Sequence, residues 1–120
     1  MITFELLSDA GVLVVKPKGA LSAENFRDIS ERIDPYIHEK GKLSGLLIEA
    51  ASFPGWDSFG ALIEHFKFVH DHHRNINRVA VVTNDAFLKV APTIARHFAH
   101  PEIRVFKGGE RVKALEWLQT

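Results

Sequence analysis

The sequence predicts an α/β fold: a mostly parallel sheet with one antiparallel edge strand, covered by helices. Near the N-terminus, two apolar runs flank a turn-forming segment, a pattern typical of a β-hairpin. Further along, short apolar runs alternate with segments whose apolar residues recur every three or four positions. This alternation predicts parallel strands joined by right-handed helical crossovers. The expected element order is β-β-α-β-α-β-α-β-α.

The hairpin is predicted from the first nineteen residues. Residues 2–7 mix apolar and polar side chains as an edge strand does, and residues 9–11 (Asp-Ala-Gly) form the turn. Residues 12–15 are all apolar, which predicts the second strand. Pro17 and Gly19 should end it, because proline cannot donate to a sheet ladder.

The first helix is predicted between Ser22 and Gly41. Ser22 is a good N-cap, and Glu24 in the first turn suits the helix dipole. Gly41 is a natural residue to end the helix. The apolar positions of one helical face are Phe26, Ile29, Ile33, Tyr36 and Ile37.

A buried strand at residues 46–48, preceded by Gly45, and a loop over residues 51–56 lead to the second helix. Its apolar stripe is expected to contain Leu62, Ile63, Phe66 and Val69. Phe66 and Phe68 are two positions apart, so at least one aromatic ring must leave that stripe.

The remaining elements follow the same alternation. Residues 79–82 predict a buried strand, and residues 103–106 predict the last one. Gly108 and Gly109 predict a turn before a closing helix over residues 112–118. A third helix lies between these strands, with Pro92 kinking it or marking its first turn. Its expected stripe is Phe87, Val90, Ala91, Ile94 and Phe98.

Composition excludes several classes of protein. The 120 residues predict a single domain, residues 1–120, with 46% hydrophobic and 25% charged residues as in ordinary globular domains. Fifteen basic and fifteen acidic residues balance, which argues against a nucleic-acid partner. No cysteine is present, as in many proteins of a reducing cytoplasm. Neither a signal peptide nor an apolar run of about 20 residues is seen, so we expect a cytoplasmic location.

Charge is unevenly distributed along the chain. Residues 1–60 carry six Lys or Arg and nine Asp or Glu, a net −3, whereas residues 61–120 carry nine and six, a net +3. Six of the seven histidines also fall in the second half. Mild acid should therefore charge mainly that half.

The segment from Gly45 to Gly60 resembles the STAS domain family. A buried strand at residues 46–49 leads to Asp57-Ser58-Phe59-Gly60 at a helix start. The preceding Phe53-Pro54-Gly55-Trp56 loop is closer to the SpoIIAA-like (STAS/SEC14-like) branch of that family. The resemblance extends over nearly the whole chain and is carried by apolar patterns.

In regulatory STAS proteins the serine of this Asp-Ser pair is phosphorylated, which implies Ser58 as a phosphosite with Asp57 beside it. A phosphoryl group at a helix N-terminus is stabilised by free backbone N–H groups. The alternative is that Asp57 or Ser58 simply caps the helix, and we favour it because most helices carry such a cap. The small residue that usually follows the serine in STAS proteins is replaced here by Phe59. The resemblance at Ser58 still implies a second functional hypothesis, a phospho-regulated switch that docks a regulatory protein partner.

The SpoIIAA-like resemblance implies instead an apolar or lipid-like ligand bound between helices that open, with membrane association, peripheral at the inner membrane. Trp56 would be its gate or interfacial anchor. Arg74, Lys89 and Arg96 would meet acidic head groups. The alternative for these apolar residues is core packing or a homodimer interface. The expected ligand or membrane contacts are Trp56, Phe59, Leu62, Ile63, Phe66, Phe87, Val90 and Ile94.

Neither a metal site nor an active site is predicted. The second helix ends with His70, His72 and His73, and the third with His97 and His100. No carboxylate completes a ligand set, so we expect solvated histidines that favour helix C-termini. The carboxylates that could meet in a strand-end crevice are Glu49, Asp57 and Glu64. No nucleophile faces a base among them, and we expect a non-enzymatic protein without a cofactor.

Overall fold

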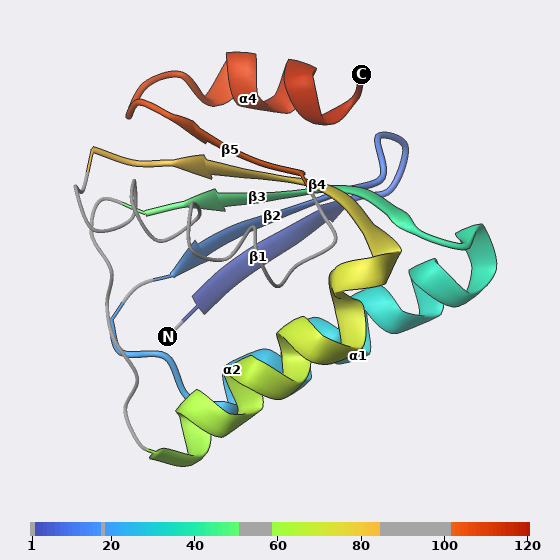
Figure 1. Ribbon diagram of the computed structural model, residues 1–120, viewed down its shortest axis with the longest axis vertical. Helices are drawn as coiled ribbons and strands as arrows, with labels where there is room; N and C mark the ends of the chain where they lie inside the picture. The colour runs from blue at the N-terminus through green and yellow to red at the C-terminus, as the bar shows by residue number, and fades with distance from the viewer. Residues whose placement is uncertain (1, 18, 51–58, 85–101) are drawn as a thin grey trace.

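A five-stranded mixed sheet forms the centre of the structure, in the order β1-β2-β3-β4-β5. The computed structural model describes residues 2–17, 19–50, 59–84 and 102–120. β1 runs antiparallel to β2, and the pairs from β2 to β5 are parallel, as predicted (Figure 1). The strands are β1 (Ile2–Leu7), β2 (Val12–Pro17), β3 (Leu43–Glu49), β4 (Ile76–Val82) and β5 (Glu102–Phe106).

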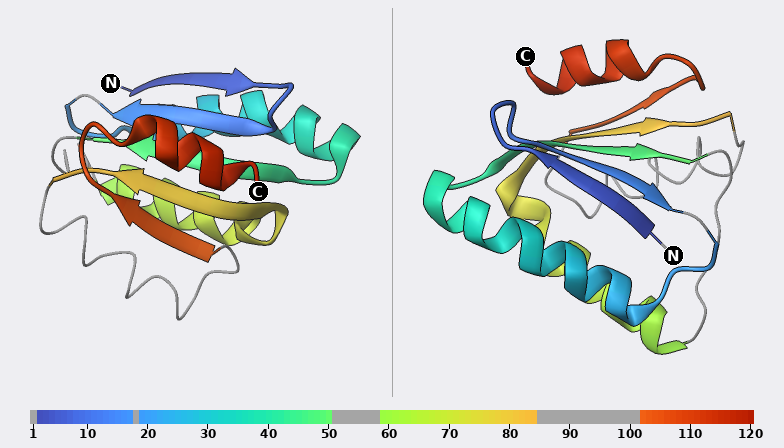
Figure 2. Two further views of the ribbon diagram at one scale, coloured as in Figure 1. Left: turned by 90° about the horizontal axis from the view of Figure 1, so that it is seen from above. Right: turned by 180° about the vertical axis from the view of Figure 1, so that it is seen from behind.

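Helices cover both faces of this sheet (Figure 2). α1 (Ala23–Lys40) and α2 (Phe59–His72) lie side by side on one face, and the short 3-10 helix η1 (His73–Asn75) connects α2 to β4. α4 (Arg111–Leu118) lies on the opposite face. The predicted third helix, with Phe87, Val90, Ala91, Ile94 and Phe98, falls outside the described residues.

Side chains alternate between the two layers along each buried strand. In β2, Leu13 and Val15 pack in the core under α1, whereas Val12 and Val14 pack in the core under α4. All four are buried. The run is apolar throughout because both of its faces are covered, which confirms the interpretation of these runs as buried strands.

α1 begins and ends where its capping residues predict. The Ser22 hydroxyl accepts a hydrogen bond from the Asn25 backbone N–H at 3.2 Å, and Asn25 Oδ1 accepts one from the Ser22 N–H at 2.9 Å. This reciprocal pair is a capping box built with Asn25. At the other end Gly41 adopts a φ of 88° and donates its N–H to the Ile37 carbonyl, which satisfies one of the free carbonyls there.

Two strands begin three residues before their apolar runs. β3 starts at Leu43, so Gly45 lies inside the strand, and β4 starts at Ile76, so Arg78 lies inside it. Gly45 and Arg78 are partners in the parallel ladder. Backbone hydrogen bonds extend both strands through polar positions. The pattern of apolar side chains does not show this extension, so it predicts strands that are too short.

The expected stripe of α2 is wrong at its C-terminal end. Val69 is 41% exposed, whereas Phe68 packs against the core and against the ring of Phe26. α2 packs beside α1, and the face turned to that helix is the one that carries Phe68.

Candidate functional site

The structure describes only part of the predicted ligand-binding set. Trp56, Asp57, Ser58, Phe87, Val90, Ile94, Lys89 and Arg96 lie outside the described residues. Phe59, Leu62, Ile63 and Phe66 belong to α2, but their side chains also lie outside the description. Arg74 is exposed in η1, next to α2. Their functional roles therefore stay predictions.

Aromatic rings join α2 to α1 in a contact that we call the α1–α2 interface, formed by Phe26, Asp34, His65, Phe68 and His72. The His65 ring stacks on Phe26 with 4.8 Å between centroids and an interplanar angle of 15°. Phe68 contacts Phe26 at 6.2 Å and stacks on His72 at 4.4 Å. Four rings from two helices thus form one continuous contact.

His72 is buried within this interface, at 6% exposure. Its Nδ1 lies 2.8 Å from the Phe68 carbonyl oxygen, and its Nε2 lies 2.6 Å from Oδ1 of Asp34. The expectation that this histidine is solvated is wrong. Sequence spacing places His72 at the end of α2 but does not show that α1 crosses there with Asp34, so the signal for burial lies in the tertiary contact.

His65 is the second histidine of the interface. Burial lowers the pKa of His65, because the charged imidazolium loses its hydration there. Its neutral ring therefore stacks on Phe26 as an apolar surface. The sequence predicted no role for His65, because a single histidine on a helix carries no signal of its stacking partner.

A groove of about 250 Å³ lies along the α1–α2 interface. Phe26 and Phe68 supply its rings. Glu64 and Lys67, which face each other at 3.9 Å, belong to its charged lining. The other lining residues are Arg27, Ser30, Glu31, Asp34 and Asp71. Aromatic surface and a charged lining together suit an amphipathic molecule.

The carboxylates expected to share one crevice lie on opposite sides of the sheet. Glu49 follows Leu47 on the face under α4, where its Oε1 is 3.6 Å from both Lys16 Nζ and an Arg111 guanidinium nitrogen. Glu64 lies in the groove beside α1. Asp57 is outside the described residues. The expectation that Glu49 and Glu64 meet is wrong, because alternation along β3 turns Glu49 away from α2.

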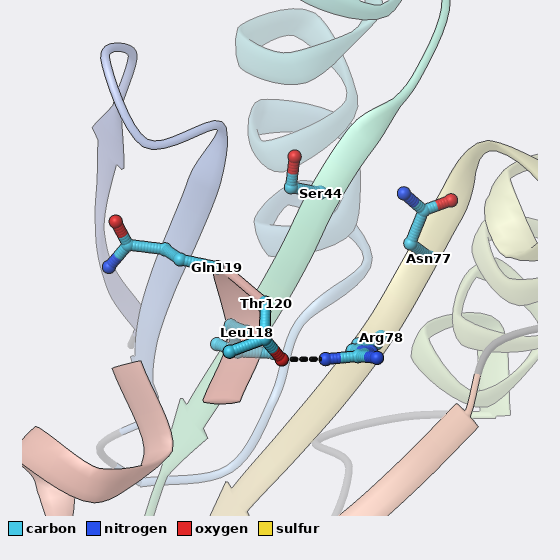
Figure 3. A pocket seen from close by; sticks show the side chains of 6 residues that line it. All are labelled: Ser44, Asn77, Arg78, Leu118, Gln119 and Thr120. Carbon is cyan, nitrogen blue, oxygen red and sulfur yellow. Dashed lines mark hydrogen bonds between the residues drawn. The ribbon is translucent and has the colours of Figure 1, made fainter. Parts of the chain in front are cut away.

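A polar pocket of about 300 Å³ lies at the C-terminal end of α4 (Figure 3). Arg78 donates to the Trp117 carbonyl at 2.7 Å and to the Thr120 hydroxyl. Its guanidinium also lies 5.1 Å from the centre of the Trp117 ring. Arg78 therefore stabilises the negative end of the helix dipole, and we assign it a structural role. The lining residues are Ser44, Asn77, Arg78, Leu118, Gln119 and Thr120.

The described residues contain neither a cluster of metal ligands nor a membrane-spanning helix. In the parts of the chain that the structure describes, no three His, Asp or Glu side chains gather as metal ligands would. Within the same residues, no helix is long and apolar enough to cross a membrane.

The sheet order, the antiparallel edge pair and the placement of the helices define a mixed α/β protein with the SpoIIAA-like fold. The SpoIIAA-like family model matches residues 12–119, and the chain belongs to this family. It is similar to the crystal structure of an uncharacterized protein from the DUF3478 family of Shewanella loihica PV-4, which has a SpoIIAA-like fold. The two are 24% identical, the match covers 98% of this chain and 92% of that one, and the TM-score is 0.68. No curated protein matches the chain.

Proposed function

We propose that this SpoIIAA-like protein is a non-enzymatic binding module that takes an apolar or lipid-like ligand by displacement of α2, with peripheral attachment to membranes. The observation that carries the proposal is the ring contact between α2 and α1. Phe68 and His65 both stack or pack on Phe26. An apolar ligand can replace such contacts at little cost, since burial of apolar surface is not directional.

The groove supports the same function. It runs beside Phe26 and Phe68 and carries charged side chains along its lining. A ligand with an apolar body and a polar end would meet both kinds of surface. In this proposal the α2 residues Phe59, Leu62, Ile63 and Phe66 line the opened site. From the remaining segments Trp56, Phe87, Val90 and Ile94 join them, and Arg74 meets acidic head groups.

Two measurements test the proposal. Purified protein is titrated with the apolar fluorophore N-phenyl-1-naphthylamine, and it is floated with vesicles of phosphatidylcholine alone or with 30% phosphatidylserine. We expect saturable dye uptake and stronger flotation with the anionic vesicles. Absence of dye uptake together with flotation that ignores lipid charge would overturn the proposal.

Native mass spectrometry of the protein purified gently from its own cells identifies the alternative. An added mass that organic extraction removes supports the bound apolar ligand. A covalent phosphoryl mass on Ser58, without such a ligand, would favour the phospho-regulated switch in place of the binding module.

A further inference from the structure

We propose that the His72–Asp34 pair is a proton-dependent link: the His72 imidazolium holds the C-terminal end of α2 on α1, and loss of its proton loosens that end. The pair joins the last residue of α2 to the middle of α1. His72 is buried, whereas the Asp34 side chain is 58% exposed. The link itself follows from the geometry of two hydrogen bonds.

Both ring nitrogens of His72 face acceptors. The Phe68 carbonyl oxygen, 2.8 Å from Nδ1, accepts hydrogen bonds and cannot donate. The Asp34 carboxylate oxygen, 2.6 Å from Nε2, likewise accepts. A neutral imidazole carries one N–H and satisfies one of these acceptors, whereas the imidazolium satisfies both. The proposal therefore assigns both contacts to the imidazolium, the form that has a donor for each acceptor.

Aromatic and acidic side chains surround His72. The Phe68 ring stacks on the imidazole at 4.4 Å, an arrangement that attracts a cation. α1 contributes Asp34 and, one turn earlier, Glu31 to the groove. Among the described side chains of α2 and η1, the neighbouring titratable groups are Glu64, His65, Lys67, Asp71 and the exposed Arg74. Of these, Lys67 is paired with Glu64 at 3.9 Å.

Loss of one proton weakens this contact. The neutral ring has a single N–H for two acceptors, so one of its nitrogens then turns a lone pair to an oxygen atom, and the attraction between the imidazolium and the Asp34 carboxylate is lost. A buried polar atom that loses its partner costs about 1–3 kcal/mol, so the end of α2 separates from α1 more often as pH rises. The consequence for ligand entry, that alkaline conditions favour it, rests on the proposed function. The link does not.

Nitrogen NMR of protein labelled with ¹⁵N-histidine tests the link directly. At pH 7.5 we expect both His72 nitrogens to carry protons, whereas exposed His38 on α1 serves as the solvated reference. In Asp34→Asn, whose amide can also donate to Nε2, we expect the doubly protonated His72 signal to be lost. A neutral His72 in the wild-type protein, or a signal that Asp34→Asn leaves unchanged, would overturn the proposal.

Hydrogen exchange and dye uptake separate the two proposals. After correction for intrinsic rates, the amides of residues 67–72 should exchange faster as pH rises in the wild type, with no such trend in Asp34→Asn. If the trend appears and no dye binds at any pH, the link stands and the proposed function fails. If dye binds equally well at all pH values while exchange shows no trend, the link fails and the proposed function stands.

Discussion

Gly45 in β3 lies against Leu118 in α4 with no space for a side chain between them. A Cβ atom on Gly45 would lie 2.7 Å from Cδ2 and 2.8 Å from Cβ of Leu118. Leu118 is 2% exposed, and its Cβ cannot move without the helix. The absence of a side chain at position 45 therefore sets how closely α4 approaches the sheet.

We expect Gly45→Ala to lower the free energy of unfolding by about 1–3 kcal/mol, the usual cost of overpacking. Urea unfolding followed by circular dichroism measures it. Leu118→Ala alone should also destabilise, by about 2–5 kcal/mol through the cavity it leaves. The double variant should lose somewhat less than the sum, because Leu118→Ala removes the Cδ2 and Cγ atoms that the new methyl group would meet, although the close contact with Cβ remains. Strict additivity would contradict a direct contact between these positions.

Ser22→Ala should lower the free energy of unfolding by about 1 kcal/mol, since it removes the acceptor for the Asn25 N–H. Ser22→Asp keeps an acceptor at the N-cap and should unfold at nearly the wild-type urea concentration. Equal losses in the two variants would contradict the assignment of this stability to the side-chain acceptor at position 22.

Acid should destabilise the protein through His65. Burial lowers the pKa of His65 in the folded state below its ordinary value of 6.5, so the unfolded chain binds the proton more readily. The contribution of His65 to stability is therefore complete above about pH 6.5 and is lost as pH falls through the lower folded-state value. Urea unfolding at pH 7.5, 6.5 and 5.5 measures the free energy of unfolding. Its decrease between pH 7.5 and pH 5.5, which we call the acid loss, should be smaller in His65→Phe than in the wild type.

The matched control is His38→Gln, because His38 is exposed on α1. It should leave the acid loss unchanged. Each variant is compared with the wild type at the same pH, so that the contribution proposed for the His72–Asp34 pair is the same in both. An acid loss in His65→Phe equal to that of the wild type would contradict the assignment.

A covalent tether between α1 and α2 should abolish dye uptake if α2 must move. The chain contains no cysteine, so Ser30→Cys and Lys67→Cys provide two unique thiols across the groove that both residues line. A short bismaleimide joins them, and the two single-cysteine variants treated with the same reagent are the controls. Dye uptake that survives complete cross-linking would show that the ligand enters elsewhere.

Much of the fold was predictable because local patterns determine it. Ser22 and Gly41 mark the ends of α1, and the turn before Val12 places the hairpin. The alternation of Leu13 and Val14 between two cores is why the run reads as apolar throughout. These features depend on neighbours in sequence, so a single chain displays them.

The candidate site was less predictable because it depends on pairs far apart in sequence. His72 and Asp34 are 38 positions apart, and neither has a local pattern that indicates the other. Val69 and Phe68 are adjacent apolar residues, and only the position of α1 decides which of them is covered. Glu49 and Glu64 were expected to meet, but strand alternation and helix placement separate them.

The sequence by itself determined the order of the described elements, the mixed sheet and the caps of α1, because periodicity and capping are short-range effects. The tertiary structure alone decided that His72 is buried against Asp34 and that rings of α2 pack on Phe26. It also decided that α4 packs closely against Gly45. Those outcomes follow from how helices pack across a sheet. Packing joins distant residues whose contact has no trace in the local pattern of either one.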